Sequence, residues 1–118
     1  MPATGSRIEA WTLLFQSYFD IEVNTDETSS KARKLYGAVS ECREELEEII
    51  SQNLAKGWTL TRISKESRAV LSLALYEILH DEKTPNAVAI NEAIEIIKVY
   101  GADEDYRFVN AILDKYAN

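Results

Sequence analysis

Residues 65–79 read KESRAVLSLALYEIL, and this stretch decides the fold. From Ala69 to Leu79 nearly every residue is apolar, so apolar side chains would occupy almost the whole circumference of a helix. A helix of that kind is stable where other elements cover it on all sides. We therefore expect residues 65–79 to form the central helix of a bundle.

The composition favours one helical domain around that segment. A chain of 118 residues is the length of a single domain, and its 46% hydrophobic content is too high for a disordered chain. It contains four glycines and two prolines, and β-branched residues rarely alternate with polar ones. The sequence predicts an all-α bundle of five or six helices in two sequential groups, forming one domain over residues 1–118.

Two helices are expected before the central one. The first begins with Ser6 as N-cap and Glu9 three residues later, which is a capping box. Residues 20–29, DIEVNTDETS, are rich in turn formers and predict a loop. Residues 29–54 then carry an apolar stripe typical of one long helix, in which Gly37 costs about 1 kcal/mol relative to alanine.

Two more helices are expected after it. Residues 55–64, AKGWTLTRIS, contain a glycine stop and a segment that could form one helical turn. Thr84 is expected to cap the next helix, with Pro85 in its first turn. That helix, residues 86–100, should end at Gly101 in the left-handed conformation that glycine favours.

The last helix follows the stretch GADEDYRFVN, residues 101–110. Asp103 or Asp105 can cap it, and the consecutive acids suit the positive end of its dipole. An aromatic residue, an arginine and a second aromatic residue come directly after the acids. The same short stretch can therefore serve as a helix start and as part of a recognition surface.

Charge and cysteine content limit the function classes. The net charge of −7 argues against general binding to nucleic acid, which needs a basic surface, but it leaves room for a local site. Cys42 is the one cysteine, so an internal disulfide and a cysteine metal cluster are both excluded. Without a signal peptide pattern or a membrane-length apolar run, the chain is expected to be soluble and cytoplasmic.

The sequence offers little for catalysis. His80 is the one histidine, and its place after a helix favours a surface role at the helix end. No glycine-rich phosphate loop, zinc spacing or calcium loop is present. We expect no enzyme activity, no cofactor and no metal site. An enzyme would need a polar pocket around His80 or around paired carboxylates.

The aromatic residues at the two ends of the chain suggest recognition instead. Phe15 and Phe108 are core residues by default, but an exposed ring beside Arg7 or Arg107 could stack on an unpaired base. Such stacking is worth about 1–3 kcal/mol per base. Sequence-specific RNA recognition uses single strands in this way, so modest basicity can suffice.

Two longer segments carry a family resemblance. AVLSLALYEIL (residues 69–79) and AVAINEAIEIIKVYGADEDYRFVNAILDKY (residues 87–116) resemble the carboxyl half of the NusB family of transcription antitermination factors. WTLTRIS (residues 58–64) also sits where that family has a short segment before its central helix. The resemblance is strong over residues 58–117, weaker over residues 6–20, and little more than helical pattern between them.

The resemblance implies an all-α NusB-like bundle of about six to seven helices in two three-helix groups. It also implies binding to boxA, a short single-stranded RNA element in ribosomal RNA leaders, together with NusE, a protein of the small ribosomal subunit. The complex helps RNA polymerase to pass termination signals, and no reaction is catalysed. A bacterial source is implied as well.

Carried over by position, the resemblance implies an RNA-binding surface of five side chains: Arg7, Phe15, Glu104, Arg107 and Phe108. The surface that faces NusE would include three residues near the start of the central helix: Ser67, Arg68 and Ser72. The family commonly has several arginines at its amino end, where this chain has Arg7 alone, and Ser72 stands where an arginine is frequent. We therefore expect weak, mildly salt-dependent RNA binding unless NusE supplies part of the surface.

Two alternatives remain open at this stage. The chain could be a NusB-like scaffold for protein interactions that has lost RNA binding, which the depleted basic amino end favours. The apolar helices also permit a homodimer, since some family members form dimers that cover their RNA surface.

Overall fold

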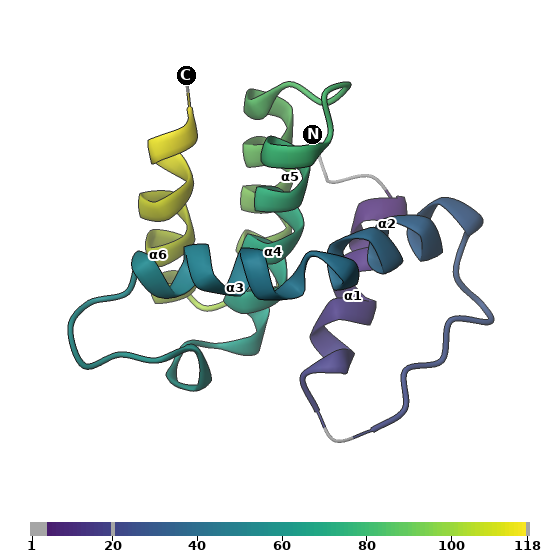
Figure 1. The fold of residues 1–118 in the computed structure, drawn as a ribbon, viewed down its shortest axis with the longest axis horizontal. Coiled ribbons are helices and arrows are strands. Elements are labelled where there is room, and N and C mark those ends of the chain that lie inside the picture. Colours follow the sequence, from purple (N-terminus) through teal and green to yellow (C-terminus); the bar gives the residue numbers. More distant parts are fainter. Residues whose placement is uncertain (1–4, 20, 118) are drawn as a thin grey trace.

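The computed structural model of the protein describes residues 5–19 and 21–117, and the regular structure in these ranges is entirely helical (Figure 1). The helices are α1 (Gly5–Ser17), α2 (Ser30–Glu41), α3 (Arg43–Gln52), α4 (Lys65–His80), α5 (Asn86–Tyr100) and α6 (Asp103–Leu113). Two short 3-10 turns, η1 (Leu60–Arg62) and η2 (Asp114–Tyr116), complete the set. The all-α prediction is confirmed, and so is the predicted helical turn within residues 55–64.

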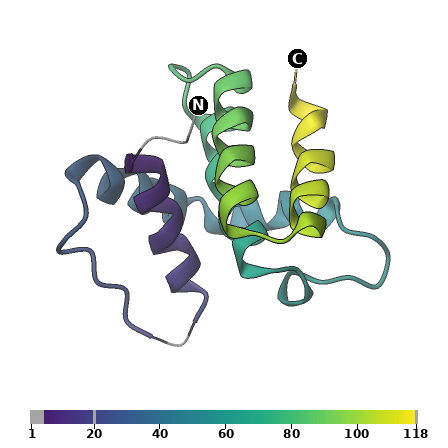
Figure 2. The same cartoon turned by 180° about the vertical axis from the view of Figure 1, so that it is seen from behind.

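Helix α4 occupies the centre of the molecule, as its apolar circumference predicts. It packs against α1, α3, α5 and α6, and its side chains Val70, Leu71 and Leu75 are fully buried. Each such side chain contributes roughly 1.5–3 kcal/mol when it leaves water. Figure 2, which views the molecule from behind, shows α4, α5 and α6 side by side and α1 and α2 as a second group. One contiguous core includes side chains from both groups.

The prediction of one long helix over residues 29–54 is wrong, because the helix is interrupted at Cys42. The backbone of Cys42 has φ −96° and ψ 10°, so α2 ends just before this residue and α3 begins just after it. The break lets α2 pack on α1 while α3 packs on α4 (Figure 1). Val39 before the break and Leu46 and Ile50 after it are all buried. The prediction of an apolar stripe is correct, but its two halves pack against different helices, α1 and α4.

The predicted capping box of the first helix is also wrong. Helix α1 begins at Gly5, so Ser6 lies inside the helix and the cap position falls outside the described residues. Glu9 accepts a hydrogen bond from the backbone nitrogen of Ser29 at 3.2 Å rather than closing a capping box. Ser29 in turn caps α2, since its hydroxyl accepts from the backbone nitrogen of Ala32 at 3.1 Å. These bonds tie the start of α2 to α1.

The turn between α4 and α5 uses Thr84 differently from the prediction. Thr84 Oγ1 donates to Asp81 Oδ2 at 2.8 Å instead of capping α5. This hydrogen bond lowers the pKa of Asp81. Pro85 takes the cap position and Asn86 is the first helical residue, so proline stands one position earlier than predicted.

Gly101 ends α5, but not in the predicted left-handed conformation. Its φ of −104° and ψ of 173° are extended and open to any residue. Glycine is needed there for a different reason, because a Cβ atom would lie 2.7 Å from Cδ1 of the fully buried Ile97. The left-handed glycine of the described chain is Gly57, with φ 88°, in the loop before η1.

Within the described residues, none of the helices combines the length and the apolar character needed to cross a lipid bilayer.

Replacing Gly37 by alanine should stabilise the protein by about 0.5–1 kcal/mol. Gly37 lies in the interior of α2, its φ is not positive, and an added Cβ atom would meet no other atom within 4 Å. Alanine therefore keeps the fold and reduces the conformational entropy of the unfolded chain. Urea denaturation of both proteins measures the change in free energy of unfolding.

The matched comparison is Gly101→Ala, which should lower the free energy of unfolding by about 1–3 kcal/mol because the new methyl group overlaps the Ile97 side chain. A destabilising Gly37→Ala change would contradict the helical assignment of the α2 interior.

Candidate nucleic-acid interface

The start of α6 is fixed by Asp105. Its Oδ2 accepts a hydrogen bond from the backbone nitrogen of Ala102 at 2.8 Å, which satisfies a free donor at the helix start. Its Oδ1 accepts from the hydroxyl of Ser67 at 3.2 Å. Neither predicted acid occupies the N-cap position, which is Ala102, but Asp105 holds the helix start through its side chain from the third helical position. It also joins the first turn of α6 to the first turn of α4.

The three residues of α6 that the family resemblance implies for RNA binding lie on one face of the helix. Glu104, Arg107 and Phe108 are spaced three and four residues apart, which places them on neighbouring positions of one helical face. Glu104 and Arg107 are exposed and Phe108 is half-buried. The structure therefore brings together three of the five side chains that the family resemblance implies for RNA binding.

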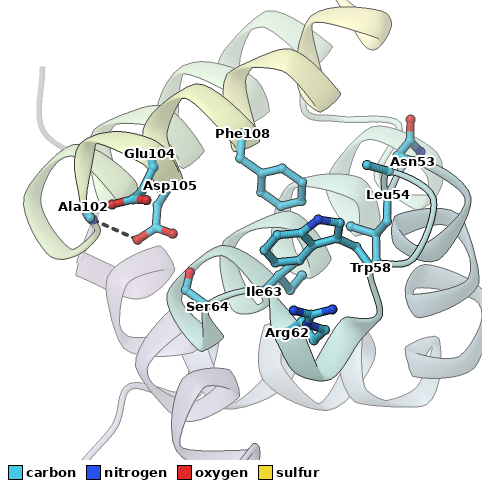
Figure 3. A pocket seen from close by; sticks show the side chains of 11 residues that line it. Asn53, Leu54, Trp58, Arg62, Ile63, Ser64, Ala102, Glu104, Asp105 and Phe108 are labelled. Atoms are coloured by element: carbon cyan, nitrogen blue, oxygen red, sulfur yellow. Dashed lines mark hydrogen bonds between the residues drawn. The ribbon is translucent and has the colours of Figure 1, made fainter.

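A cleft of about 550 Å³ lies between this turn of α6 and the chain segment that joins α3 to α4. Its lining comprises Asn53, Leu54, Ala55, Trp58, Arg62, Ile63, Ser64, Ala102, Glu104, Asp105 and Phe108. Figure 3 shows the rings of Trp58 and Phe108 pointing toward one another in the cleft, with Glu104 on the α6 side. Arg107 lies on the adjacent turn but outside the lining.

Trp58 and Arg62 form the loop side of the cleft. The indole of Trp58 is 50% exposed, and the guanidinium carbon of Arg62 lies 4.9 Å from its ring centre. Cation–π contact at an exposed site contributes about 0.5–1 kcal/mol and restrains both groups. Arg62 also donates to the carbonyl of Gly57 at 3.4 Å, where the left-handed glycine turns the loop. The ring is therefore held at the loop side of the cleft with half of its surface exposed.

Neither Trp58 nor Arg62 was among the predicted site residues. One sequence feature could have predicted them. Trp58 is an aromatic residue inside a polar, glycine-containing loop, where no apolar helical stripe requires a large ring, and Arg62 follows four residues later.

The cleft has the components of a site for single-stranded nucleic acid. Two aromatic rings offer stacking surfaces for bases, whatever the base sequence. The Glu104 carboxylate can accept a hydrogen bond from an exocyclic base amino group, and Arg62 can donate to a phosphate. Base contacts of this kind are available in unpaired RNA, whose Watson–Crick edges are exposed.

Arg7 is placed away from this cleft, in an ion pair with Glu77 of α4. Arg7 Nε and Nη2 donate to the two carboxylate oxygens of Glu77 at 2.9 and 2.8 Å, and Arg7 Nη1 lies 3.3 Å from Glu92 Oε1. The hydrogen bond to Glu77 raises the pKa of Arg7 above its ordinary value. Glu77 is only 3% exposed, so the guanidinium neutralises a carboxylate that lies in the core.

Phe15 also lies outside the cleft lining, in an aromatic cluster between α1 and α5. Its ring stacks on Trp11 at 5.4 Å and meets Phe19 edge-on at 5.1 Å. Trp11 stacks in turn on Tyr100 at 4.9 Å. Phe15 is half-buried there, while Phe19 and Tyr100 are exposed.

The three residues expected to face a protein partner differ in accessibility. Ser67 and Ser72 are buried, so neither side chain reaches the surface of this structure. The hydroxyl of Ser72 lies 3.5 Å from that of Tyr18, and burial raises the pKa of Tyr18. Arg68 is half-buried and donates to Glu47 at 2.9 Å, with its guanidinium 4.3 Å above the Tyr18 ring. Arg68 is thus the accessible member of the three.

Comparison with known proteins gives one consistent answer. The sequence model of the NusB family matches residues 6–118. The transcription antitermination protein NusB of Clostridium botulinum (strain Alaska E43 / Type E3) is 44% identical over 82 residues, covering 70% of this chain. That alignment spans 61% of the relative's own length.

Two solved structures share the fold. T. maritima NusB superposes with a TM-score of 0.83 at 36% identity, covering 99% of this chain and 92% of that chain. A crystal structure of the antitermination factors NusB and NusE in complex with dsRNA gives a TM-score of 0.80 at 19% identity, covering 96% of this chain and 93% of that one.

Replacing Arg7 by methionine should lower the free energy of unfolding by about 2–4 kcal/mol. The change leaves the Glu77 carboxylate buried without its guanidinium, and the partial exposure of Arg7 keeps the cost below that of a fully buried pair. The double change Arg7→Met/Glu77→Leu should recover much of the loss, since an apolar pair can replace a buried ion pair. Chemical denaturation of the three variants forms a double-mutant cycle.

Arg107→Met is the control, because it removes an equally long cation from an exposed position on α6 and should change stability by less than about 0.5 kcal/mol. Equal stability of Arg7→Met and the parent protein would refute the structural role of this pair.

Proposed function

The chain belongs to the NusB family, as its motifs predicted, and from that premise we propose that it is a transcription antitermination factor. It binds boxA-type single-stranded RNA of ribosomal RNA leaders together with NusE, and the complex lets RNA polymerase pass termination signals. The family consists of non-enzymatic antitermination factors, so the prediction that the chain is not an enzyme is confirmed. The proposal places the protein in the bacterial cytoplasm, with residues 1–118 acting as one RNA-binding domain.

The observation that carries the proposal is the cleft between α6 and the segment before α4. Glu104 and Phe108, both expected from the family resemblance, line it together with Trp58 and Arg62. We assign base stacking to the two rings and base recognition to the Glu104 carboxylate. Arg62 and the neighbouring Arg107 are assigned to the phosphates.

The other two residues expected to bind RNA, Arg7 and Phe15, contact parts of the protein outside the cleft. Arg7 neutralises Glu77 in the structure, and Phe15 packs within the aromatic cluster of α1 and α5. Direct RNA contacts by these two residues stay predictions, and the proposal does not depend on them.

The surface proposed for NusE lies along α1 and the start of α4. Arg68 covers the ring of Tyr18, and the Lys65 ammonium lies 5.1 Å from the ring centre of Phe19. These cations and rings are next to the Ser67 and Ser72 positions that the family resemblance implies. The two serines support that surface from beneath, since both are buried.

A second candidate is a NusB-like scaffold that binds proteins and has lost RNA binding. The net charge of −7 and the engagement of Arg7 with Glu77 favour it, because both weaken attraction for phosphate. RNA affinity with and without NusE separates the two candidates.

Replacing Trp58 by alanine should weaken the binding of boxA-type RNA by about 1–3 kcal/mol, the worth of one stacked base. Fluorescence anisotropy of labelled RNA, titrated with the protein and NusE, measures the change. Scrambled single-stranded RNA and a duplex of the boxA sequence test whether recognition needs both sequence and unpaired bases. Tyr100→Ala is the matched control, since Tyr100 is 47% exposed and lies outside the cleft lining.

Equal loss of affinity in Trp58→Ala and Tyr100→Ala would remove the cleft from the RNA site. Absence of selective binding even with NusE, from a folded protein, would establish the scaffold function instead.

The affinity of the isolated protein for RNA should depend only mildly on salt. With Arg62 and Arg107 as the phosphate contacts, the slope of log K against log salt concentration should be about −1 to −1.5. Anisotropy titrations over a series of salt concentrations give this slope. A steep slope for the isolated protein would contradict the assignment of binding energy to stacking.

A further inference from the structure

A group of three side chains outside the cleft lining joins the α2–α3 junction to the end of α4. Cys42 sits in the junction, Glu45 in the first turn of α3, and His80 is the last residue of α4. One thiol, one carboxylate and one imidazole atom from these residues all lie within 4.8 Å of one another. His80 Nε2 and Glu45 Oε1 are in direct contact.

We propose that Cys42, Glu45 and His80 form a Zn²⁺ site that clips the α2–α3 junction to α4. Thiolate, imidazole and carboxylate are the three ligand types that proteins use for zinc, with Zn–S bonds of about 2.3 Å and Zn–N and Zn–O bonds of about 2.0–2.2 Å. Ligand atoms around a tetrahedral ion with such bonds lie about 3.3–3.7 Å apart. To hold the ion, the contacting His80 Nε2 and Glu45 Oε1 atoms must move apart, and the most separated ligand atoms must approach one another by roughly 1 Å.

The exposure of two of the three side chains permits these movements. Cys42 is half-buried, whereas the side chains of Glu45 and His80 are 53% and 38% exposed and can change rotamer without disturbing the core. The ring of Tyr76 lies 5.7 Å from that of His80 and limits how far the imidazole can turn away. The exposed side leaves a path for the ion and a fourth position for a water molecule.

The ligand types select zinc over the abundant hard cations. Ca²⁺ and Mg²⁺ require oxygen ligands, and this group supplies one carboxylate, one nitrogen and one sulfur. On binding, the thiol proton leaves to solvent and the sulfur binds as thiolate. An ordinary surface ion pair between His80 and Glu45 would make no use of the thiol, so dependence on Cys42 is the decisive property.

The site would act on the angle between the two helix groups. Helix α2 packs on α1 and α3 packs on α4, with Cys42 as the break between them. An ion shared by Cys42, Glu45 and His80 ties this break to the end of the central helix. Zinc should therefore raise the thermal unfolding midpoint of the protein, because it binds the folded chain and finds no assembled site in the unfolded one.

The test uses the full chain without a histidine tag, kept reduced with a phosphine. Co²⁺ serves as the probe, since thiolate ligation produces a charge-transfer band, and Zn²⁺ is then added to displace it. Calorimetric titration with Zn²⁺ gives affinity and stoichiometry. We expect the thiolate band, one Zn²⁺ per chain, and a rise in the thermal unfolding midpoint with Zn²⁺.

Cys42→Ser and His80→Gln test the ligands, with circular dichroism to establish that each variant is folded. Each change should weaken Zn²⁺ binding by more than about tenfold. Losing only a hydrogen-bond partner of a metal ligand typically costs about tenfold or more, and these changes remove a ligand itself. Cys42→Ser should also remove the thiolate band. Glu44→Gln is the matched control, an exposed carboxylate in the same turn as Glu45 and outside the group, and should leave affinity unchanged.

Absence of the thiolate band, or equal Zn²⁺ affinity in the parent and both folded ligand variants, would overturn the site. A stoichiometry of one ion per two chains would overturn its intramolecular form.

Discussion

The burial of α4 is the constraint from which the rest of the structure follows. A helix with apolar side chains around its circumference needs neighbours on every side, and α1, α3, α5 and α6 supply them. Helix α4 also buries a charged residue, Glu77, which is 3% exposed. Burying a carboxylate is costly unless a cation accompanies it, so Arg7 from the first helix must reach it across 70 positions of sequence. The core therefore determines how the amino end of the chain is used.

The candidate interface depends on α4 in a similar way. Asp105 bonds both to the start of its own helix and to Ser67 on α4, which fixes where the first turn of α6 lies. That placement leaves Glu104 and Phe108 facing the loop that carries Trp58. Neighbouring acids in residues 103–105 therefore have different roles. The Asp105 carboxylate holds the helix in place, and the Glu104 carboxylate lines the cleft.

Sequence alone predicted the parts of the fold that periodicity and burial control. The central helix and the all-helical class followed from the apolar pattern, and the family followed from motifs at its carboxyl end. Periodicity could not locate the break at Cys42, because an apolar stripe looks the same whether it meets one neighbour or two. Gly101 was recognised as a helix end, but its cause, the close approach of Ile97, is a tertiary contact. Trp58 gave a local signal, yet the ring that faces it lies 50 positions away on another helix.

The charges of this chain bear on what kind of RNA recognition it can perform. Arg7 is engaged with Glu77 and Arg68 with Glu47, so these two guanidinium groups are already balanced by carboxylates within the fold. Attraction to phosphate is long-ranged and insensitive to sequence, whereas stacking and hydrogen bonds to base edges act at contact and depend on unpaired bases. A surface without strong attraction to phosphate binds every RNA more weakly, but it still prefers some RNA sequences over others. An acidic protein with a stacking cleft is therefore suited to recognise one short element while a second protein contributes the phosphate contacts that hold the RNA in place.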